Sequence, residues 1–230
     1  MSRWHAVAFD LDDTLYPEWS FVLGGFRAAA AWAQAHLGRP AEETSAELVS
    51  LFQDGVRGDT FDRWLASHGL GPDAVPELVR AYREHAPTLT PYPGITGLLE
   101  SLQGSRRLGL LSDGDFAVQR RKLGALGISR YFDAIVFTDV WGRDGWKPAA
   151  RPFRELLDGL GVDAAEAVYV ADNPAKDFLG PRELGMSSIR VRFPDALHAG
   201  VPAPTEHHAA DLCADSVGEL AEILGIALPG

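Results

Sequence analysis

Five short runs of strand-forming residues constrain the fold of this chain more than any other feature of its sequence. Most of these runs are continuously apolar, which is typical of parallel sheets whose strands are buried on both faces. Segments of helical length, with apolar spacing near 3.6 residues, separate the last four runs, as βαβ units require. The sequence therefore predicts an α/β core with a doubly wound parallel sheet. The runs lie at residues 5–9, 107–112, 134–138, 167–171 and 188–193.

The interval between the first two runs has a different pattern. Residues 17–90 contain no convincing strand, and their apolar side chains recur at helical spacing. This interval is too long for a simple crossover between neighbouring strands. We therefore expect a small all-helical cap domain at 17–90, inserted into a Rossmann-like catalytic core formed by residues 1–16 and 91–230.

Composition limits the classes of partner. The chain has 230 residues and a formal net charge of -11, whereas a nucleic-acid surface needs a basic stripe. No apolar run approaches the roughly 20 residues of a membrane span, and the N-terminus lacks a signal-peptide pattern. The single cysteine, Cys213, fits a reducing compartment. We expect a cytoplasmic protein with no nucleic-acid or membrane partner, and the sequence predicts no oligomeric state.

Polar residues follow four of the predicted strands. Ligands of doubly wound sheets bind outside the carboxyl ends of the strands, so these residues are expected to converge at one edge of the sheet. They are Asp10, Asp12 and Thr14 after the first strand, Ser112, Asp113 and Gly114 after the second, Lys147 after the third, and Asp172 and Asp177 after the fourth.

Three of these carboxylates, Asp10, Asp12 and Asp172, form a set of hard oxygen ligands. Such a set suits Mg²⁺, with water and phosphate oxygens completing an octahedron, and the metal would offset the repulsion among the clustered charges. A carboxylate can attack phosphorus to give an aspartyl-phosphate, and a second one can protonate the leaving oxygen and then activate water. Ser112 and Lys147 offer a hydroxyl and a fixed positive charge to phosphoryl oxygens.

Four motifs along the chain resemble, in the same order, those of the haloacid dehalogenase-like (HAD) hydrolase superfamily. They are DLDDT at 10–14, LLS at 110–112, KP at 147–148 and ADNPAKD at 171–177. The helical insert resembles the type 1 cap of the phosphatase branch of that superfamily. The likeness covers nearly the whole chain.

The resemblance implies a role for each matching residue. Asp10 would be the nucleophile and a metal ligand, and Asp12 the general acid and base and, through its backbone carbonyl, another ligand. Ser112 and Lys147 would hold the phosphoryl group, and Asp172 would complete the metal shell.

Two further acidic residues have less direct roles. Asp177 would orient metal-bound waters or Lys147 from outside the ligand shell, and a helix first-turn position is its alternative. Asp13 has no motif role and is predicted to be a solvated or helix-capping carboxylate.

The remaining candidates are substrate contacts. Asp113 stands where many relatives have Asn, so its carboxylate either points away from the phosphate or binds a substrate hydroxyl or amine. Glu18 and Trp19 enter the insert beside the nucleophile and could touch substrate, and packing of the indole is the alternative. Thr14 and Gly114 complete this group.

The predicted function is a Mg²⁺-dependent phosphomonoesterase that hydrolyses a small phosphate ester, such as a sugar phosphate or nucleotide, through an aspartyl-phosphate. A phosphomutase on the same scaffold is the main alternative. The dehalogenase branch uses no metal and no acid at the position of Asp12, so Asp12 and Asp172 argue against it. A signalling receiver domain is disfavoured, because such a domain carries its phospho-accepting Asp on the third strand and has no helical insert. A non-catalytic regulatory protein is disfavoured because all the chemical residues are present.

Overall fold

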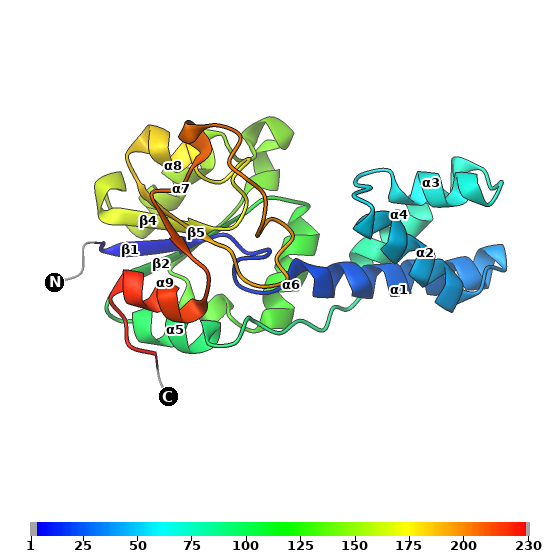
Figure 1. Cartoon of the computed structure of the whole chain (residues 1–230), viewed down its shortest axis with the longest axis horizontal. Helices are drawn as coiled ribbons and strands as arrows, with labels where there is room; N and C mark the ends of the chain where they lie inside the picture. The colour runs from blue at the N-terminus through cyan, green and yellow to red at the C-terminus, as the bar shows by residue number, and fades with distance from the viewer. Residues whose placement is uncertain (1–3, 229–230) are drawn as a thin grey trace. The chain divides into compact units, whose positions relative to one another are not determined.

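The structure is a computed structural model that describes residues 4–228. Contacts divide the chain into two compact units, one formed by Met1–Trp19 with Leu89–Gly230 and the other by Ser20–Thr88. The sequence had placed the two domain boundaries between residues 16 and 17 and between residues 90 and 91, within three residues of these positions. In Figure 1 the smaller unit contains the blue and cyan helices, and the larger unit contains all the strands.

A six-stranded sheet in the order β3-β2-β1-β4-β5-β6 forms the centre of the larger unit. Every neighbouring pair of strands runs parallel, so the predicted α/β fold with a parallel, Rossmann-like sheet is confirmed. The strands are β1 (Ala6–Phe9), β2 (Arg107–Ser112), β3 (Ala134–Phe137), β4 (Ala167–Ala171), β5 (Ser187–Val191) and β6 (Leu212–Ala214).

The first five strands match the runs identified in the sequence, and β6 was not predicted. It extends the sheet by pairing with β5, with Ile189 opposite Leu212 and Val191 opposite Ala214. Three residues are too few to show a period of two or a continuous apolar run, so the neighbouring strand rather than the local sequence determines this element.

Helices cover both faces of the sheet. In Figure 1, α7 and α8 lie on one face and α5 and α9 on the other, which is the doubly wound arrangement. The helix α6 follows β2 and supplies side chains to the candidate site described below. The helices of this unit are α5 (Ile95–Leu102), α6 (Phe116–Leu126), α7 (Ala150–Leu160), α8 (Leu179–Leu184) and α9 (Val217–Leu224).

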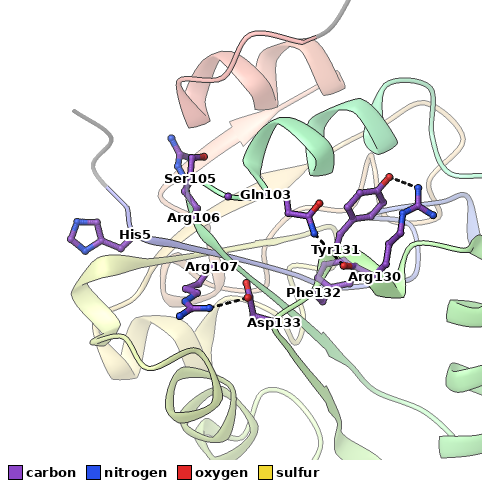
Figure 2. A pocket seen from close by; sticks show the side chains of 10 residues that line it. His5, Gln103, Ser105, Arg106, Arg107, Arg130, Tyr131, Phe132 and Asp133 are labelled. Carbon is purple, nitrogen blue, oxygen red and sulfur yellow. Dashed lines mark hydrogen bonds and ion pairs between the residues drawn. The ribbon is translucent and has the colours of Figure 1, made fainter.

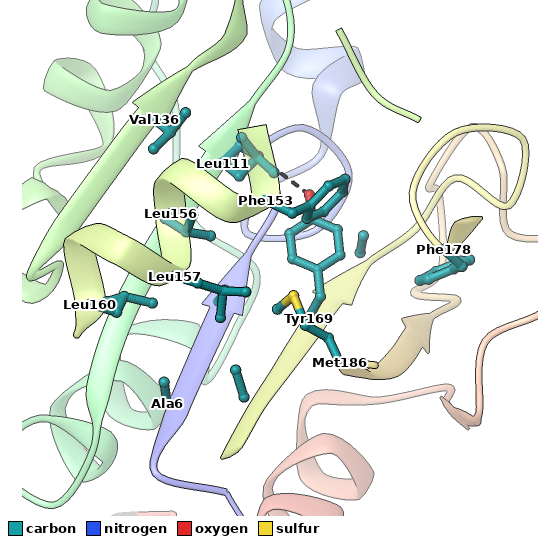
Figure 3. Packing of buried hydrophobic residues seen from close by; sticks show 13 residues of the cluster. Ala6, Leu111, Val136, Phe153, Leu156, Leu157, Leu160, Tyr169, Phe178 and Met186 are labelled. Carbon is teal, nitrogen blue, oxygen red and sulfur yellow. Dashed lines mark hydrogen bonds between the residues drawn. The ribbon is translucent and has the colours of Figure 1, made fainter. Parts of the chain in front are cut away.

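The core beneath α7 depends on small residues in the strands. A Cβ at Gly109 of β2 would lie 3.0 Å from methyl carbons of both Leu156 and Leu160, so glycine permits the helix to approach closely. Figure 3 shows the leucines of α7 over the sheet, with the ring of Phe153 beside that of Tyr169. These two rings meet edge to face, with centroids 5.0 Å apart, and this packing fixes the Tyr169 hydroxyl near the strand ends.

The unit from Ser20 to Thr88 contains helices only. An aromatic cluster forms its core, because the ring of Phe26 packs against those of Phe52, Phe61 and Tyr82 with centroids 5.5 to 6.2 Å apart. None of the helices in the described part of the chain is long and apolar enough to cross a membrane. The helices of this region are α1 (Glu18–Leu37), α2 (Ala41–Gln53), α3 (Thr60–Ser67) and α4 (Val75–Glu84).

Candidate active site

The sheet order brings the predicted site residues together at one edge. Strand β1 lies between β2 and β4, so residues that follow these three strands become neighbours. The backbone N–H of Asp10 donates to the carbonyl of Val170 at 2.9 Å, which continues the β1–β4 ladder by one residue. Asp10 therefore starts from a fixed backbone position, with Asp172 directly after β4 and Ser112 at the end of β2.

Lys147, from the loop after β3, lies at the centre of this cluster. Its ammonium group is 2.7 Å from an oxygen of Asp10 and 2.7 Å from one of Asp177, and it donates to the hydroxyl of Tyr169 at 3.0 Å. Burial lowers the pKa of Lys147, but Asp10 and Asp177 outweigh burial and raise it above its ordinary value. The side chain thus remains a buried cation at neutral pH.

Three buried carboxylates, two of them paired with this cation, lie close together. Ligand oxygens of Asp10, Asp172 and Asp177 all lie within 4.8 Å of one another. Burial raises the pKa of Asp10 to about 6 against the lowering effect of Lys147. Burial also raises the pKa of Asp172 well above its ordinary value, and the charges of Asp177 and Asp10 add to the effect. Three carboxylates so close together repel one another, and one lysine neutralises only part of their charge.

This donor set fits a hard divalent cation. Oxygen Oδ2 of Asp172 is buried and has no hydrogen-bond partner among the residues that the structure describes. An unpaired buried carboxylate oxygen is costly, and oxygens of this type are the ligands that Mg²⁺ takes in proteins. The structure adds Asp177 to the carboxylates that could hold the ion, whereas the sequence placed it outside the ligand shell.

The carboxylate of Asp12 is held mainly by side chains of α6. It accepts hydrogen bonds from Lys122 Nζ at 2.7 Å and from Gln119 Nε2 at 2.8 Å, and a third from the hydroxyl of Tyr16. Burial raises the pKa of Asp12, but the charge and hydrogen bond of Lys122 outweigh burial and lower it. The carboxylate of Asp12 is not part of the trio described above, and the metal contact of its backbone carbonyl stays a prediction.

Gln119 connects Asp12 to Ser112. The same amide nitrogen donates to the Ser112 hydroxyl at 2.6 Å, so the two predicted catalytic residues share one donor. Gln119 and Lys122 were not among the predicted site residues, because the helical spacing places Gln119 on a buried face of α6. The sequence does contain a pattern that could have indicated these two residues: a polar side chain at a buried helical position, followed three residues later by a lysine on the same face.

The carboxylate of Asp113 is held by groups of the protein, and neither of its two predicted alternatives is tested. Its Oδ1 accepts from the Thr138 hydroxyl at 2.8 Å and from the backbone N–H of Lys147 at 3.1 Å. Its Oδ2 lies 3.3 Å from the ammonium of Lys176. Burial raises the pKa of Asp113, but the two lysines and the hydrogen bonds lower it overall. Gly114 follows with φ of 120°, a backbone angle that favours glycine.

The predicted substrate contacts near the start of α1 have different surroundings. The Thr14 hydroxyl is buried and has no hydrogen-bond partner among the described residues. The carboxylate of Glu18 is 32% exposed and lies 4.0 Å from Lys122. Burial, followed by the charge of Asp12, raises the pKa of Glu18 to about 7. Trp19 follows on the first turn of α1, and its contact with substrate stays a prediction.

Asp13 corrects a prediction. A solvated carboxylate was one expectation, but Asp13 is only 1% exposed. Its side chain accepts from the backbone N–H groups of Glu18 and Leu197, both at 2.8 Å. The first of these bonds caps the start of α1, which agrees with the alternative expectation. Asp13 also has φ of 51°, a conformation that Asp adopts more readily than most residues, and it fixes the loop that carries the other carboxylates.

A cavity of about 500 Å³ lies elsewhere, where the chain enters β1 and β2. Its lining includes His5, Arg107, Arg130 and Asp133, and Figure 2 shows Arg107 directed at Asp133. These two side chains pair at 3.0 Å. The cavity is at the amino end of the strands, whereas ligands of this class of sheet bind at the carboxyl end. The carboxylate edge is therefore the candidate active site.

Comparison with known proteins agrees with this architecture. Residues 7–191 match the haloacid dehalogenase-like hydrolase family. A glyceraldehyde 3-phosphate phosphatase from Methanopyrus kandleri is 34% identical over 81% of this chain and 83% of its own length. A phosphoserine phosphatase from Thermus thermophilus is 30% identical over 81% of this chain and 72% of its own length.

A solved structure is similar to this chain in fold. The HAD phosphatase from Thermococcus onnurineus superposes with a TM-score of 0.64 at 26% identity, covering 96% of this chain and 97% of that one. The family match covers most of the chain, and the relatives named above are phosphatases that align over most of their own length. The chain therefore belongs to the haloacid dehalogenase-like hydrolase family, as one of its phosphatases.

Proposed function

We propose that the protein is a Mg²⁺-dependent phosphomonoesterase that hydrolyses a small phosphate ester through an aspartyl-phosphate on Asp10. One observation carries the proposal: the buried carboxylate of Asp10 lies 2.7 Å from the Lys147 ammonium and within a trio of carboxylates suited to a divalent cation. A nucleophile in this position faces a phosphoryl group whose charge the same cations neutralise.

Each residue of the cluster has a role in binding. Asp10, Asp172 and the Asp12 carbonyl would hold Mg²⁺, and the proximity of Asp177 supports it as a further ligand or as a partner of metal-bound water. When bound, the ion supplies positive charge to the phosphoryl oxygens. Lys147 and the Ser112 hydroxyl orient the same oxygens.

The reaction proceeds in two displacements. A carboxylate oxygen of Asp10 attacks phosphorus, the bond between phosphorus and the ester oxygen breaks, and the leaving oxygen takes a proton from Asp12. Asp12 then removes a proton from water, whose oxygen attacks the phosphorus of the aspartyl-phosphate. This step releases inorganic phosphate and regenerates both carboxyl groups.

The substrate is a small phosphate ester. Relatives named for glyceraldehyde 3-phosphate and for phosphoserine support this size class. Both named substrates are short-chain metabolites, so the proposal covers sugar phosphates, nucleotides and comparable compounds. The single cysteine, Cys213, supports the proposed cytoplasmic location.

The test is phosphate release from a panel of phosphate esters, with and without Mg²⁺. We expect release from p-nitrophenyl phosphate and from at least one metabolite, and loss of release in EDTA. Asp10→Asn should lower the rate by at least about a thousandfold while circular dichroism shows the native fold. Turnover by Asp10→Asn at the wild-type rate, or metal-independent turnover, would refute the mechanism.

A further inference from the structure

Lys176 brings a second ammonium group to the candidate site, in addition to Lys147. It lies in the loop between β4 and α8, one residue before Asp177. The side chain of Lys147 is fully buried, whereas that of Lys176 is 33% exposed. The next residue, Asp177, meets the Lys147 ammonium at 2.7 Å. The partner of Lys176, Asp113, accepts from the backbone N–H of Lys147 at 3.1 Å, so the Lys176 ammonium lies beside the carboxylate cluster.

Asp113 holds this ammonium in place. The Thr138 hydroxyl and the backbone N–H of Lys147 both donate to Oδ1 of Asp113, so two separate loop segments fix the carboxylate. Only Oδ2 faces Lys176. The carboxylate is 5% exposed, and a buried anion beside a phosphate site would be unfavourable without such a cation. Asp113 thus serves as an anchor for Lys176.

The ammonium of Lys176 keeps capacity for another anion. A lysine ammonium has three donors, and Asp113 is 3.3 Å away, whereas Lys147 approaches Asp10 at 2.7 Å. Lys147 already meets the nucleophile and has no exposed surface. A partly exposed cation near the same cluster is therefore available to a part of the substrate other than the transferred phosphoryl group.

We propose that Lys176, held by Asp113, is a specificity-determining residue that binds a second anionic group of the substrate, a carboxylate. This inference rests on the proposed phosphatase activity. It narrows the substrate class to short-chain phosphate esters that carry a second negative charge. Asp113 acts as a positioning residue, because it reaches the substrate only through Lys176.

The experiment compares two matched pairs of esters that differ in one anionic group. The pairs are phosphoserine with phosphoethanolamine, and 3-phosphoglycerate with glycerol 3-phosphate. For each pair, the ratio of kcat/KM for the carboxylate-bearing ester to that for its partner is measured with Mg²⁺. The wild type should prefer the carboxylate in at least one pair, and Lys176→Met should lower that ratio about tenfold, chiefly through KM, as expected for a partly exposed charged hydrogen bond.

Two further variants separate specificity from folding. Lys176→Arg keeps the positive charge and should restore most of the ratio. Asp113→Asn keeps an acceptor for Thr138 and for the Lys147 N–H but loses the charge that anchors Lys176, so its ratio should fall between those of wild type and Lys176→Met. If Asp113 had only a structural role, Asp113→Asn would lower kcat/KM equally for both esters of a pair.

The outcomes distinguish this inference from the function on which it rests. Lys176 does not bind a second anion of the substrate if the wild type shows no carboxylate preference, or if Lys176→Met lowers kcat/KM equally for both esters of each pair. In either case the phosphatase proposal stands. If no ester in the panel releases phosphate, including p-nitrophenyl phosphate, the proposed function fails and this inference with it.

Discussion

The ammonium of Lys147 lies 2.7 Å from a carboxylate oxygen of Asp10, and the two side chains are 0% and 3% exposed. A buried ion pair is costly to form but more costly to break, because the remaining charge has no solvent. The pair therefore ties the proposed nucleophile to stability as well as to catalysis. The second contact of Lys147, with Asp177 at 2.7 Å, makes this dependence stronger.

Lys147→Met should abolish measurable turnover and destabilise the metal-free protein by about 3–5 kcal/mol. The substitution leaves Asp10 and Asp177 buried without their cation. Urea unfolding measures the stability, and p-nitrophenyl phosphate measures the activity. Adding Asp10→Asn to Lys147→Met should recover part of the lost stability, since it removes one of the unpaired charges. A double variant less stable than Lys147→Met would contradict this account.

The sequence predicted the parallel sheet because buried parallel strands are continuously apolar, and it predicted the residues at the strand ends because such sheets bind ligands there. Asp10, Ser112, Lys147 and Asp172 meet at one edge for this reason. Their distances from one another depend on strand order and register, which a single sequence does not contain.

Residues that support the site from within regular elements were harder to predict. Gln119 occupies a helical position expected to be apolar, and the Tyr169 hydroxyl lies within an otherwise apolar strand. In the sequence each side chain resembles a core residue, because its polar atom finds its partner in another part of the chain, Asp12 for Gln119 and Lys147 for Tyr169. Asp13 was expected to be solvated or helix-capping, and the sequence could not show its second contact, with the backbone N–H of Leu197 184 residues away.

Magnesium should stabilise the wild type against heat, and EDTA should reverse the effect. A ligand that binds only the folded state contributes about 2.7 kcal/mol at one hundred times its Kd. Asp172→Asn should lose most of this Mg²⁺-dependent shift. It should also be at least as stable as the wild type without metal, because it removes a carboxylate whose pKa burial raises. Scanning calorimetry with Mg²⁺ and with EDTA checks both statements, and an undiminished shift in Asp172→Asn would exclude it as a ligand.

Asp12→Asn should separate the two halves of the reaction. p-Nitrophenolate leaves without protonation, so Asp10 can still be phosphorylated by p-nitrophenyl phosphate, but the variant lacks a base for the attacking water. We expect a burst of about one p-nitrophenolate per enzyme followed by slow turnover. Stopped-flow absorbance detects the burst. Asp10→Asn is the matched control and should give no burst, and a burst in that variant would mean that another residue is the nucleophile.

Lys122→Met should lower kcat with little change in KM, because Lys122 holds the Asp12 carboxylate at 2.7 Å. We expect a loss of about tenfold to a hundredfold, within the range that general acid–base catalysis contributes. Alkyl phosphates should be affected more than p-nitrophenyl phosphate, since their leaving oxygen needs the proton. Equal losses on both classes would show that Lys122 does not support protonation of the leaving oxygen.

Glu18 should make stability depend on pH. Burial, followed by the charge of Asp12, raises its pKa to about 7, whereas the unfolded chain has the ordinary value near 4.5. The folded state therefore holds this proton more tightly than the unfolded chain does. Glu18 does not lower the free energy of unfolding below pH 4.5, and the wild type loses stability as the pH rises from there through 7. Glu18→Gln removes this loss, and the variant should gain stability relative to wild type by about 1 kcal/mol between pH 5 and pH 8, allowing for partial exposure.

Urea unfolding of metal-free protein at the two pH values measures this difference. Glu222→Gln is the control, because that residue lies in α9, far along the chain from the carboxylate cluster, and is exposed. It should show the pH dependence of the wild type. If the free energy of unfolding of Glu18→Gln changes between pH 5 and pH 8 as much as that of the wild type, Glu18 ionises as an ordinary surface carboxylate. The unfavourable interaction with Asp12 that the structure implies would then be absent.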